Sequence, residues 1–325
     1  MAGGTSHPAC RNPRGIIYHM LDTISKLGTT GEHRVQALLA AVEIGMMELV
    51  ASSSRDKLGY TEDAGAASAS HLATGGQRVR ARLALSAAAA NGVDEPTAIR
   101  LAIAAELFHN ASLVQDDLQD RSRLRRGMPA TWARYGDDVA MCSGDLMLSA
   151  GYCALAGIAD RRRLPALLGC AHRQISRAIL GQCADRRAGG IGAVAWDHYE
   201  EIAAAKSGAL LSLPLELALI TADLDDYSAQ ARDAANSFAV GYQIVDDLVD
   251  EAEDRDNGES GPGLNAVLIL APEWGRDAVL EAGRRAVHCL RAASDIAARL
   301  PNGSGHLLCA LVHALEARAS ERTGA

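Results

Sequence analysis

The stretch Asp116–Asp120 reads D-D-L-Q-D, and Asp246–Asp250, 130 residues further along the chain, reads D-D-L-V-D. In a helix, positions i, i+1 and i+4 of such a stretch place three carboxylates on one flank, where like charges repel one another. Hard divalent cations such as Mg²⁺ use oxygen ligands of this kind and readily bridge carboxylates to phosphates. One acidic cluster is typical of a solvated helix end. Two of them, each preceded by an apolar run, favour a paired metal site.

The composition indicates helices rather than strands. Hydrophobic residues make up 48% of the 325 residues and aromatic ones only 4%, and strand-favouring residues are scarce beside Ala, Leu, Arg and Glu. Helical periodicity is nearly continuous and breaks at turns that contain glycine or proline. We therefore predict one all-α domain over residues 1–325, a single large helical bundle of roughly ten or more helices. The expected helices are 35–51, 78–91, 95–120, 138–158, 164–184, 197–222, 227–252, 275–299 and 304–320, with a long loop over 52–76.

Composition also disfavours several classes of protein. A net charge of −8 argues against a nucleic-acid surface. The seven cysteines are scattered and form no C-x-x-C pair, which is typical of reduced thiols in the cytoplasm. The N-terminus lacks the apolar segment of a signal peptide, and residues 1–14 are expected to be disordered. The apolar stretch Gly208–Ala222 contains Pro214 and Glu216 and is too short to span a bilayer, so we expect a soluble, cytoplasmic protein.

Basic residues follow the first acidic cluster. Four arginines lie between Asp120 and Gly127. Beside metal-binding carboxylates they suit a diphosphate group, because guanidinium groups bind its oxygens bidentately. The alternative is that these arginines only neutralise the aspartates. His109 lies two helical turns before Asp116 and shares its face, although a lone histidine on a helix is more often a core residue.

Three further features are candidates for contact with a phosphate or a cation. The segment 75–80, G-G-Q-R-V-R, places a glycine pair at a helix start, where backbone N–H groups attract phosphate. Gln243 lies three residues before Asp246 and faces the same way. Lys206 is one of only three lysines in the chain, and the plainer alternative is that it is a surface cation.

Together these motifs resemble the trans-isoprenyl diphosphate synthases, also called polyprenyl synthetases. The similarity runs from the glycine pair at 75 to Asp250, over half of the chain. Each motif alone is weak, whereas the ordered set is specific. The matching motifs are G-G-Q-R-V-R (75–80), H-N-A-S-L-V-Q-D-D-L-Q-D (109–120), R-R-G-M-P-A-T (125–131), G-D-L-M-L (144–148), G-Q-C-A-D (181–185), K-S-G-A (206–209) and G-Y-Q-I-V-D-D-L-V-D (241–250).

The resemblance implies a cavity inside the helical bundle, with the two acidic clusters facing each other across it and three Mg²⁺ ions held there. The direct metal ligands would be Asp116, Asp120 and Asp246. The residues implied to bind the metals directly or through water are Asp116, Asp117, Asp120, Asp246, Asp247 and Asp250.

The same resemblance implies roles for the basic and polar residues. Arg125 and Lys206 would hold the allylic diphosphate, and the Lys206–Ser207 backbone with Gln243 would stabilise the allylic cation. The residues that match positions for isopentenyl diphosphate are Gln77, Arg80, His109 and Arg126.

The implied activity is the Mg²⁺-dependent, head-to-tail condensation of isopentenyl diphosphate with an allylic diphosphate. The growing chain would run down the helix that ends at Asp116. Ala111 and Ser112 are small where members that stop at C15 often carry aromatic residues, so the tunnel is expected to be open there. Phe108, eight residues before Asp116 and roughly 12 Å deeper, would be the floor. We expect C20, geranylgeranyl diphosphate, with C15, farnesyl diphosphate, as the second choice.

Two departures from the family pattern bear on these expectations. Gln77 stands where a lysine usually binds isopentenyl diphosphate, and the loss of one charge-assisted hydrogen bond costs about 1.5–3 kcal/mol. Arg78 or Arg80 would have to compensate. Segment 251–265 contains no lysine, although the family usually has a G-K pair after the second cluster, and Arg255 is an uncertain substitute. Gln115, where histidine is frequent, is a milder change.

Three readings of the function stay open at this point. The first is the synthase; the second is an enzyme of the same fold that transfers a prenyl group to another acceptor or cyclises the chain. A cyclase would normally show N-D-x-x-S-x-x-x-E in place of the second acidic cluster, and this chain does not. The third is a non-catalytic helical subunit of a heteromeric synthase, which would not need both acidic clusters. A homodimer is expected from the resemblance alone.

Overall fold

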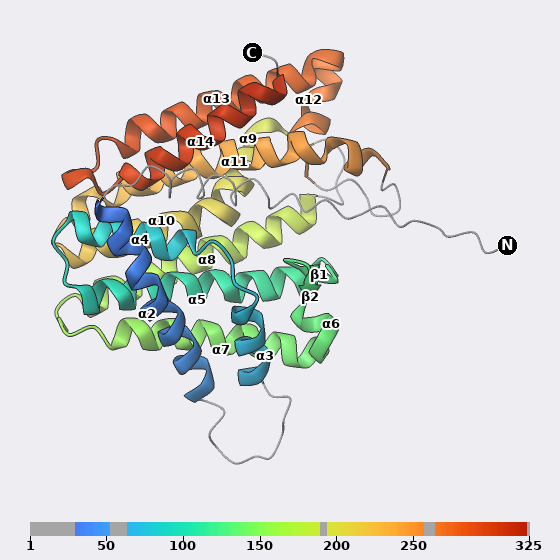
Figure 1. Ribbon diagram of the computed structural model, residues 1–325. Helices are drawn as coiled ribbons and strands as arrows, with labels where there is room; N and C mark the ends of the chain where they lie inside the picture. The colour runs from blue at the N-terminus through green and yellow to red at the C-terminus, as the bar shows by residue number, and fades with distance from the viewer. Residues whose placement is uncertain (1–29, 53–63, 189–193, 257–263, 324–325) are drawn as a thin grey trace.

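The computed structural model describes residues 30–52, 64–188, 194–256 and 264–323, and these are almost entirely helical (Figure 1). Helices α11, α13 and α14 form one layer of the bundle, and α5 and α7 lie in another. The expected disorder of residues 1–14 falls outside the described residues. The elements are α2 (Thr30–Ser52), α3 (Ala64–Ala73), α4 (Val79–Ala90), α5 (Glu95–Gln119), β1 (Leu124–Arg125), β2 (Met128–Pro129), α6 (Thr131–Tyr135), α7 (Asp137–Ala156), α8 (Leu164–Ala188), α9 (Trp196–Ala203), η2 (Ala204–Gly208), α10 (Ala209–Thr221), η3 (Asp225–Tyr227), α11 (Ser228–Asp256), α12 (Ala266–Trp274), η4 (Gly275–Asp277), α13 (Ala278–Ala297), η5 (Pro301–Gly303) and α14 (His306–Thr323).

Helices α5 and α10 form the centre of the bundle. Every residue of α10 from Ala209 to Ile220 is buried, and α5 packs against α2, α4, α7 and α10. A helix that is apolar around its whole circumference belongs in a core. Among the described residues, Asp137–Ala156 and Trp196–Thr221 are long and apolar enough to cross a membrane by length and composition alone. In Trp196–Thr221, 78% of the most apolar stretch is buried inside the protein. Burial in the core therefore accounts for the apolar composition of this segment.

Acidic side chains cap the N-terminal ends of α4 and α5. Asp94 accepts a hydrogen bond from Thr97 N at 3.0 Å at the start of α5, which satisfies one of the unpaired N–H groups of a helix N-terminus. Helix α4 is capped by another helix, because Glu106 of α5 accepts a hydrogen bond from Ala81 N at 3.1 Å. This contact fixes the segment before α4 against α5.

A two-residue turn joins β1 and β2, in which Arg125 pairs with Met128. Arg126 and Gly127 both have positive φ, 53° and 77°, as the central residues of the favoured hairpin turns do. These strands could not be predicted from apolar alternation, because each has only two residues.

The structure corrects three details of the sequence prediction. Segment 52–76 was expected to be a loop, but 64–73 of it forms α3, because its alanines are good helix formers and one face is buried against α7. Helix α12 was not predicted; Asn265 caps it by accepting hydrogen bonds from Val267 N and Leu268 N. Asp197 is followed three residues later by Glu200, a spacing that predicts a capping box, but helix α9 begins after Ala195 and Asp197 lies in its first turn.

A buried carboxylate joins α8, α10 and α11. Glu216 of α10 is fully buried and accepts hydrogen bonds from Gln174 Nε2 at 2.8 Å and from Arg232 Nη2 at 3.2 Å. A carboxylate is tolerated in such a place only when its oxygens are paired. Glu216 therefore holds three helices in register around the cavity described below.

Replacement of Glu216 by alanine should lower the free energy of unfolding by about 3–5 kcal/mol, because it leaves the partner groups unpaired. The matched control is Glu201→Ala, since the Glu201 side chain is 77% exposed and pairs only with His198, and its effect should be below about 1 kcal/mol. Chemical denaturation measures both. Equal effects of the two substitutions would contradict a structural role for Glu216.

Candidate active site

The first acidic cluster lies at the C-terminal end of α5, and its aspartates have different surroundings. Asp117 is buried and accepts two hydrogen bonds from Arg125, one of them from Nε to Oδ2 at 2.7 Å. Asp120 is exposed and accepts a hydrogen bond from Arg186 at 2.9 Å. Asp116 lines a cavity. The cluster thus contains two aspartates that are each paired with an arginine and one that borders the cavity.

The charge of Asp116 is unfavourable in its surroundings. Burial, together with repulsion from Asp120 and Asp117, raises the pKa of Asp116 to about 6, although Lys206 and Arg125 act in the opposite direction. Such a carboxylate is short of nearby positive charge. A divalent cation is the kind of ligand that would supply it.

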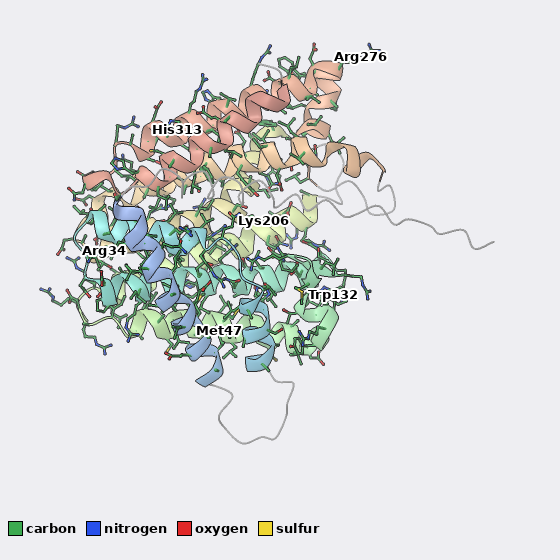
Figure 2. The ribbon with its side chains drawn as sticks, viewed as in Figure 1. Arg34, Met47, Trp132, Lys206, Arg276 and His313 are labelled. Atoms are coloured by element: carbon green, nitrogen blue, oxygen red, sulfur yellow. The ribbon has the colours of Figure 1, made fainter. Side chains whose placement is uncertain are left out.

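Lys206 lies in the middle of the molecule, in the π-helical turn η2 (Figure 2). Its ammonium group donates a hydrogen bond to Asp185 Oδ2 of α8 at 2.5 Å. Burial alone would lower the pKa of Lys206, but Asp185, Asp116 and Asp120 outweigh it and raise the pKa. Lys206 is therefore a partly buried cation between carboxylates of two helices. The alternative prediction, that Lys206 is a surface cation, is wrong.

Two glycines let neighbouring helices approach the backbone of η2. A Cβ atom at Gly181 of α8 would lie 2.4 Å from Lys206 N, and one at Gly208 would lie 2.5 Å from Asn236 Oδ1 of α11. Real Cβ atoms do not come so close to backbone. Short π-helical turns interrupt the regular backbone hydrogen bonds of a helix and are frequent at functional sites. The turn that carries Lys206 and Ser207 is held between α8 and α11 in this way.

In the second acidic cluster, Asp247 has three hydrogen-bond donors. Tyr199 Oη lies 2.7 Å away, Ala266 N 2.8 Å and Gln243 Nε2 2.9 Å. Burial raises the pKa of Asp247 to about 7 in spite of these donors. Gln243, which the sequence placed on the face of Asp246, thus also bonds to Asp247. The side chain of Asp250 lies outside the described residues.

The segment formed by α9 and η2 contacts both acidic clusters. Tyr199 of α9 bonds to Asp247 on α11, and seven residues later Lys206 lies beside Asp185 and Asp116. Helices α5 and α11 both run toward the right in Figure 1, so their acidic ends lie on the same side of the molecule. Two clusters far apart in sequence therefore meet in one region.

Basic side chains gather around His109 of α5. Burial lowers the pKa of His109 well below its ordinary value, and Arg80, Arg126 and Arg125 lower it further. The imidazole is therefore neutral at pH 7 and can donate one hydrogen bond. Within the part of the chain that the structure describes, the Nε of Arg80 is buried without a hydrogen-bond partner, and an anion would satisfy it. The structure thus brings together four of the residues that the sequence assigned to diphosphate binding.

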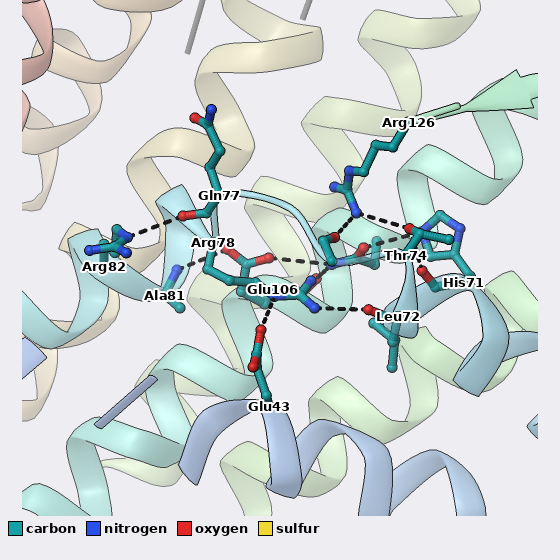
Figure 3. Close-up of polar contacts among 12 residues, drawn as sticks. Glu43, His71, Leu72, Thr74, Gln77, Arg78, Ala81, Arg82, Glu106 and Arg126 are labelled. Carbon is teal, nitrogen blue, oxygen red and sulfur yellow. Dashed lines mark hydrogen bonds and ion pairs between the residues drawn. The ribbon is translucent and has the colours of Figure 1, made fainter. Parts of the chain in front are cut away.

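The glycine pair before α4 makes room for one of these arginines. Arg126 donates hydrogen bonds to the carbonyl of Gly75 and to Thr74 Oγ1 (Figure 3). A Cβ atom at Gly76 would lie 2.6 Å from the guanidinium carbon of Arg126. Two motifs that are separate in the sequence, G-G-Q-R and R-R-G, are therefore in direct contact.

Gln77 and Arg78 have different surroundings in the same loop. Arg78 donates hydrogen bonds to Glu43 at 3.2 Å and to the Leu72 carbonyl at 2.9 Å. The side chain of Gln77 points away from these groups in Figure 3, and its Oε1 is buried without a hydrogen-bond partner. Arg78 is thus bound to the scaffold through Nε and Nη2. Within the described residues, its Nη1 and the Nε of Arg80 are both buried without a hydrogen-bond partner, so each of the two arginines keeps a donor that could compensate for Gln77.

An elongated cavity extends from the acidic end of α5 toward its middle. One face of α5 lines it with Phe108, Ser112, Gln115, Asp116 and Gln119, and the opposite wall includes residues of α7, α8, η2 and α10. Asp116 and Lys206 are charged, whereas the residues near Phe108 are apolar. The structure places Phe108 and Ser112 on the cavity wall. Ala111 is fully buried and does not line the cavity.

The donor set of this site fits a hard divalent cation. Within the described residues, no three or more His, Cys, Asp or Glu side chains are already gathered as a metal site. Asp116 nevertheless lines the cavity, and Asp117 and Asp120 follow it at the same end of α5. Oxygen donors of this kind suit Mg²⁺.

Several residues of the site were not singled out by the sequence. Asp185, the partner of Lys206, was part of a quoted motif but had no assigned role. Tyr199 was noted only by its distance from Lys206. Glu106 and His71 gave no signal; His71 is buried and bonds through Nε2 to Asn110 Oδ1 at 3.1 Å. These contacts join residues 21 to 48 positions apart, which periodicity within one helix cannot reveal.

Comparison with known proteins gives a consistent result. The family model described as polyprenyl synthetase matches residues 63–260. The chain is 36% identical over 179 residues to a (2E,6E)-farnesyl diphosphate synthase of Mycobacterium tuberculosis, which covers 54% of this chain and 48% of that protein. It is 34% identical over 191 residues to the chloroplastic heterodimeric geranylgeranyl pyrophosphate synthase large subunit 1 of Arabidopsis thaliana, with 55% and 52% covered. The matches thus span about half the length of these curated relatives.

The fold is shared with solved structures over nearly all of their length. The geranylgeranyl pyrophosphate synthetase from the archaeon Geoglobus acetivorans superimposes with a TM-score of 0.76 and 23% sequence identity. The alignment covers 87% of this chain and 99% of that one. At this level of identity the likeness establishes the fold, which confirms the predicted all-α bundle.

The electrostatics of Asp116 predict that Asp116→Asn stabilises the metal-free protein. The folded-state pKa of about 6 lies above the ordinary aspartate value of 3.8, so the cost of ionising Asp116 grows as pH rises from about 4 to 6 and is fully present above that window. At pH 7.5 the gain should be on the order of 1 kcal/mol, discounted for partial exposure, and it should vanish near pH 4. Thermal unfolding in chelator at both pH values tests this, with the exposed Asp145→Asn as control. A stability at pH 7.5 equal to or below that of the unsubstituted protein would refute it.

Proposed function

The chain belongs to the polyprenyl synthetase family, and we propose that it is a trans-prenyltransferase that joins isopentenyl diphosphate to an allylic diphosphate. The observation that carries this proposal is the juxtaposition of carboxylates, Lys206 and an apolar cavity, with a second group of basic residues around His109. An enzyme that binds two diphosphates needs two separate anion sites. It also needs an apolar space for the hydrocarbon chain.

Asp116, Asp120 and Asp246 would hold Mg²⁺, with Asp117, Asp247 and Asp250 supporting them. When bound, Mg²⁺ supplies the positive charge that makes diphosphate a better leaving group. Lys206 already lies beside Asp116, where its ammonium group can donate to the same diphosphate. Arg125 holds Asp117 in place through its bidentate contact.

We assign isopentenyl diphosphate to the basic group. Arg80 and Arg126 would bind its phosphate oxygens, and neutral His109 would donate one hydrogen bond without adding charge. The unpaired Nε of Arg80 and the unpaired Oε1 of Gln77 are buried polar atoms that a ligand would satisfy. Removal of such groups from water is tolerable only when the site is filled.

The proposed reaction breaks one carbon–oxygen bond and forms one carbon–carbon bond. The bond between C1 of the allylic chain and its diphosphate oxygen breaks, and the electron pair leaves with the diphosphate. The C=C electrons of isopentenyl diphosphate then form the new bond to C1. The released diphosphate then accepts a proton from the resulting cation, and the electrons of the broken C–H bond form the new double bond. The backbone of Lys206–Ser207 and Gln243 would lie beside the cation, and the apolar cavity would keep water away from it.

The product is proposed to be geranylgeranyl diphosphate, with farnesyl diphosphate as the shorter alternative. Ser112 leaves the cavity open one helical turn from Asp116, and Phe108 lines it one further turn below. One turn of helix rises about 5.4 Å, close to one isoprene unit. Ala111 would act only indirectly, because it is buried behind the wall.

A homodimer in the cytoplasm is proposed as the form of the enzyme. This proposal rests on the family resemblance of the chain. Met141 of α7 and Leu180 of α8 are large apolar side chains exposed by 53% and 68%, and a partner copy could cover them. Sedimentation of the purified protein tests the assembly.

A second candidate is an enzyme of the same fold that uses a different prenyl acceptor or cyclises the chain. The neutral Gln77 favours it, because it weakens the expected grip on isopentenyl diphosphate. A third is a helical subunit of a heteromeric synthase. One relative is named as the large subunit of a heterodimeric synthase.

One incubation distinguishes these candidates. Purified protein is mixed with Mg²⁺, isopentenyl diphosphate and, in turn, each allylic diphosphate from C5 to C15, and the products are identified by chain length. Chain extension supports the synthase. A hydrocarbon or terpene alcohol indicates the second candidate, and the absence of turnover without a partner protein indicates the third.

Asp116→Asn and Asp246→Asn should each lower kcat by on the order of 10²–10³, because each removes a negative donor from the leaving-group site. Steady-state kinetics at saturating Mg²⁺ measures this, with the exposed Asp145→Asn as the matched control. Near-normal turnover of either variant would argue against the assignment of metal ligands.

Gln77→Lys should lower the KM for isopentenyl diphosphate by about tenfold or more, because it restores a charge-assisted hydrogen bond. The KM for the allylic substrate should stay the same, since that substrate binds at the other anion site. If neither constant changes, Gln77 does not contact the acceptor.

A further inference from the structure

The ring of Phe108 is held against α7 by two adjacent residues. Phe108 is 1% exposed and packs edge-on against Tyr152, with ring centroids 5.1 Å apart and planes at 65°. A Cβ atom at Gly151 would lie 2.5 Å from Phe108 Cε1 and 2.8 Å from both Cδ1 and Cζ. The ring therefore occupies the space that any side chain at position 151 would need.

We infer that Gly151 and Tyr152 determine the length of the product by fixing how far the Phe108 ring projects into the cavity. This inference rests on the proposed function, because it concerns the hydrocarbon end of the same cavity. Gly151 and Tyr152 of α7 do not line the cavity themselves. They would act as positioning residues for Phe108 of α5, which does line it.

The Phe108 ring lies between α7 and the cavity. It fills the space next to Gly151 on α7 and also lines the cavity wall. Closely packed interiors do not accept an added methyl group without displacing a side chain. The cavity offers the ring a space into which it can be displaced. An added methyl group at position 151 should therefore push the ring into the path of the growing chain.

Tyr152 acts in the opposite sense. Its ring supports the edge of Phe108 and is itself partly buried. Truncation to alanine leaves a space behind Phe108 into which the ring can tilt. The cavity would then be deeper at the level where the proposed C20 chain ends.

The test measures the chain lengths formed from farnesyl diphosphate and from geranyl diphosphate by four variants. Gly151→Ala should raise the ratio of C15 to C20 by about tenfold or more, the discrimination that one methyl group provides in an apolar pocket. Tyr152→Ala and Phe108→Ala should each add products longer than C20. Gly169→Ala is the matched control, because its Cβ atom would meet only Arg173 Nη1, at an ordinary 3.5 Å.

A double variant separates positioning from general damage to the fold. Gly151→Ala combined with Phe108→Leu should restore C20 or extend it, because the smaller side chain no longer meets the added methyl group. Unchanged product lengths in both Gly151→Ala and Tyr152→Ala would overturn the inference, and so would a double variant that stays at C15. If the unsubstituted protein forms no prenyl chain at all, the proposed function fails, which is a different result.

Discussion

The site depends on keeping several carboxylates ionisable inside a helical bundle, where low polarity and mutual repulsion both oppose their charge. Each aspartate meets this constraint in its own way. Asp117 has the guanidinium of Arg125, and Asp247 has the hydroxyl of Tyr199 and a backbone N–H. Asp116 has Lys206 and Arg125 as favourable charges, and its pKa is still raised to about 6. Burial raises the pKa of Asp247 as well, but of these two carboxylates it is Asp116 that lines the cavity, as expected where binding a cation, and not folding, has determined the residue.

The charged groups also determine where glycines are needed. Gly181 lets α8 touch the backbone of the turn that carries Lys206, and Gly76 leaves space for the guanidinium of Arg126. At Gly151 the need for glycine is steric rather than electrostatic, because the Phe108 ring occupies the space that a side chain at position 151 would need. In all three cases a small residue on one element fixes the position of a functional side chain on another.

Much of the fold and of the site could be predicted from the sequence because the signals are local. The long helices follow from apolar spacing within each segment, and the two acidic clusters follow from the i, i+1, i+4 pattern. Contacts between distant segments could not be predicted in this way. The cap that Glu106 provides for α4 and the pairing of Lys206 with Asp185 join different helices, and no spacing within one helix encodes them. Helix α3 was missed because its small residues resemble a loop until their burial against α7 is known.

The two anion sites of the proposed enzyme differ in the sign of the charge on the protein side chains that form them. At the allylic site the protein supplies mainly carboxylates, so an anionic substrate binds there only together with cations. At the site around His109 the protein supplies arginines, so a diphosphate binds directly. Gln77 removes one positive charge from the proposed second site. Glu43 and the Leu72 carbonyl hold two nitrogens of the Arg78 guanidinium, while its Nη1 has no partner within the described residues. We therefore expect Gln77 to bear on the choice and affinity of the acceptor, whereas the absence of lysine from segment 251–265 would bear on the allylic site.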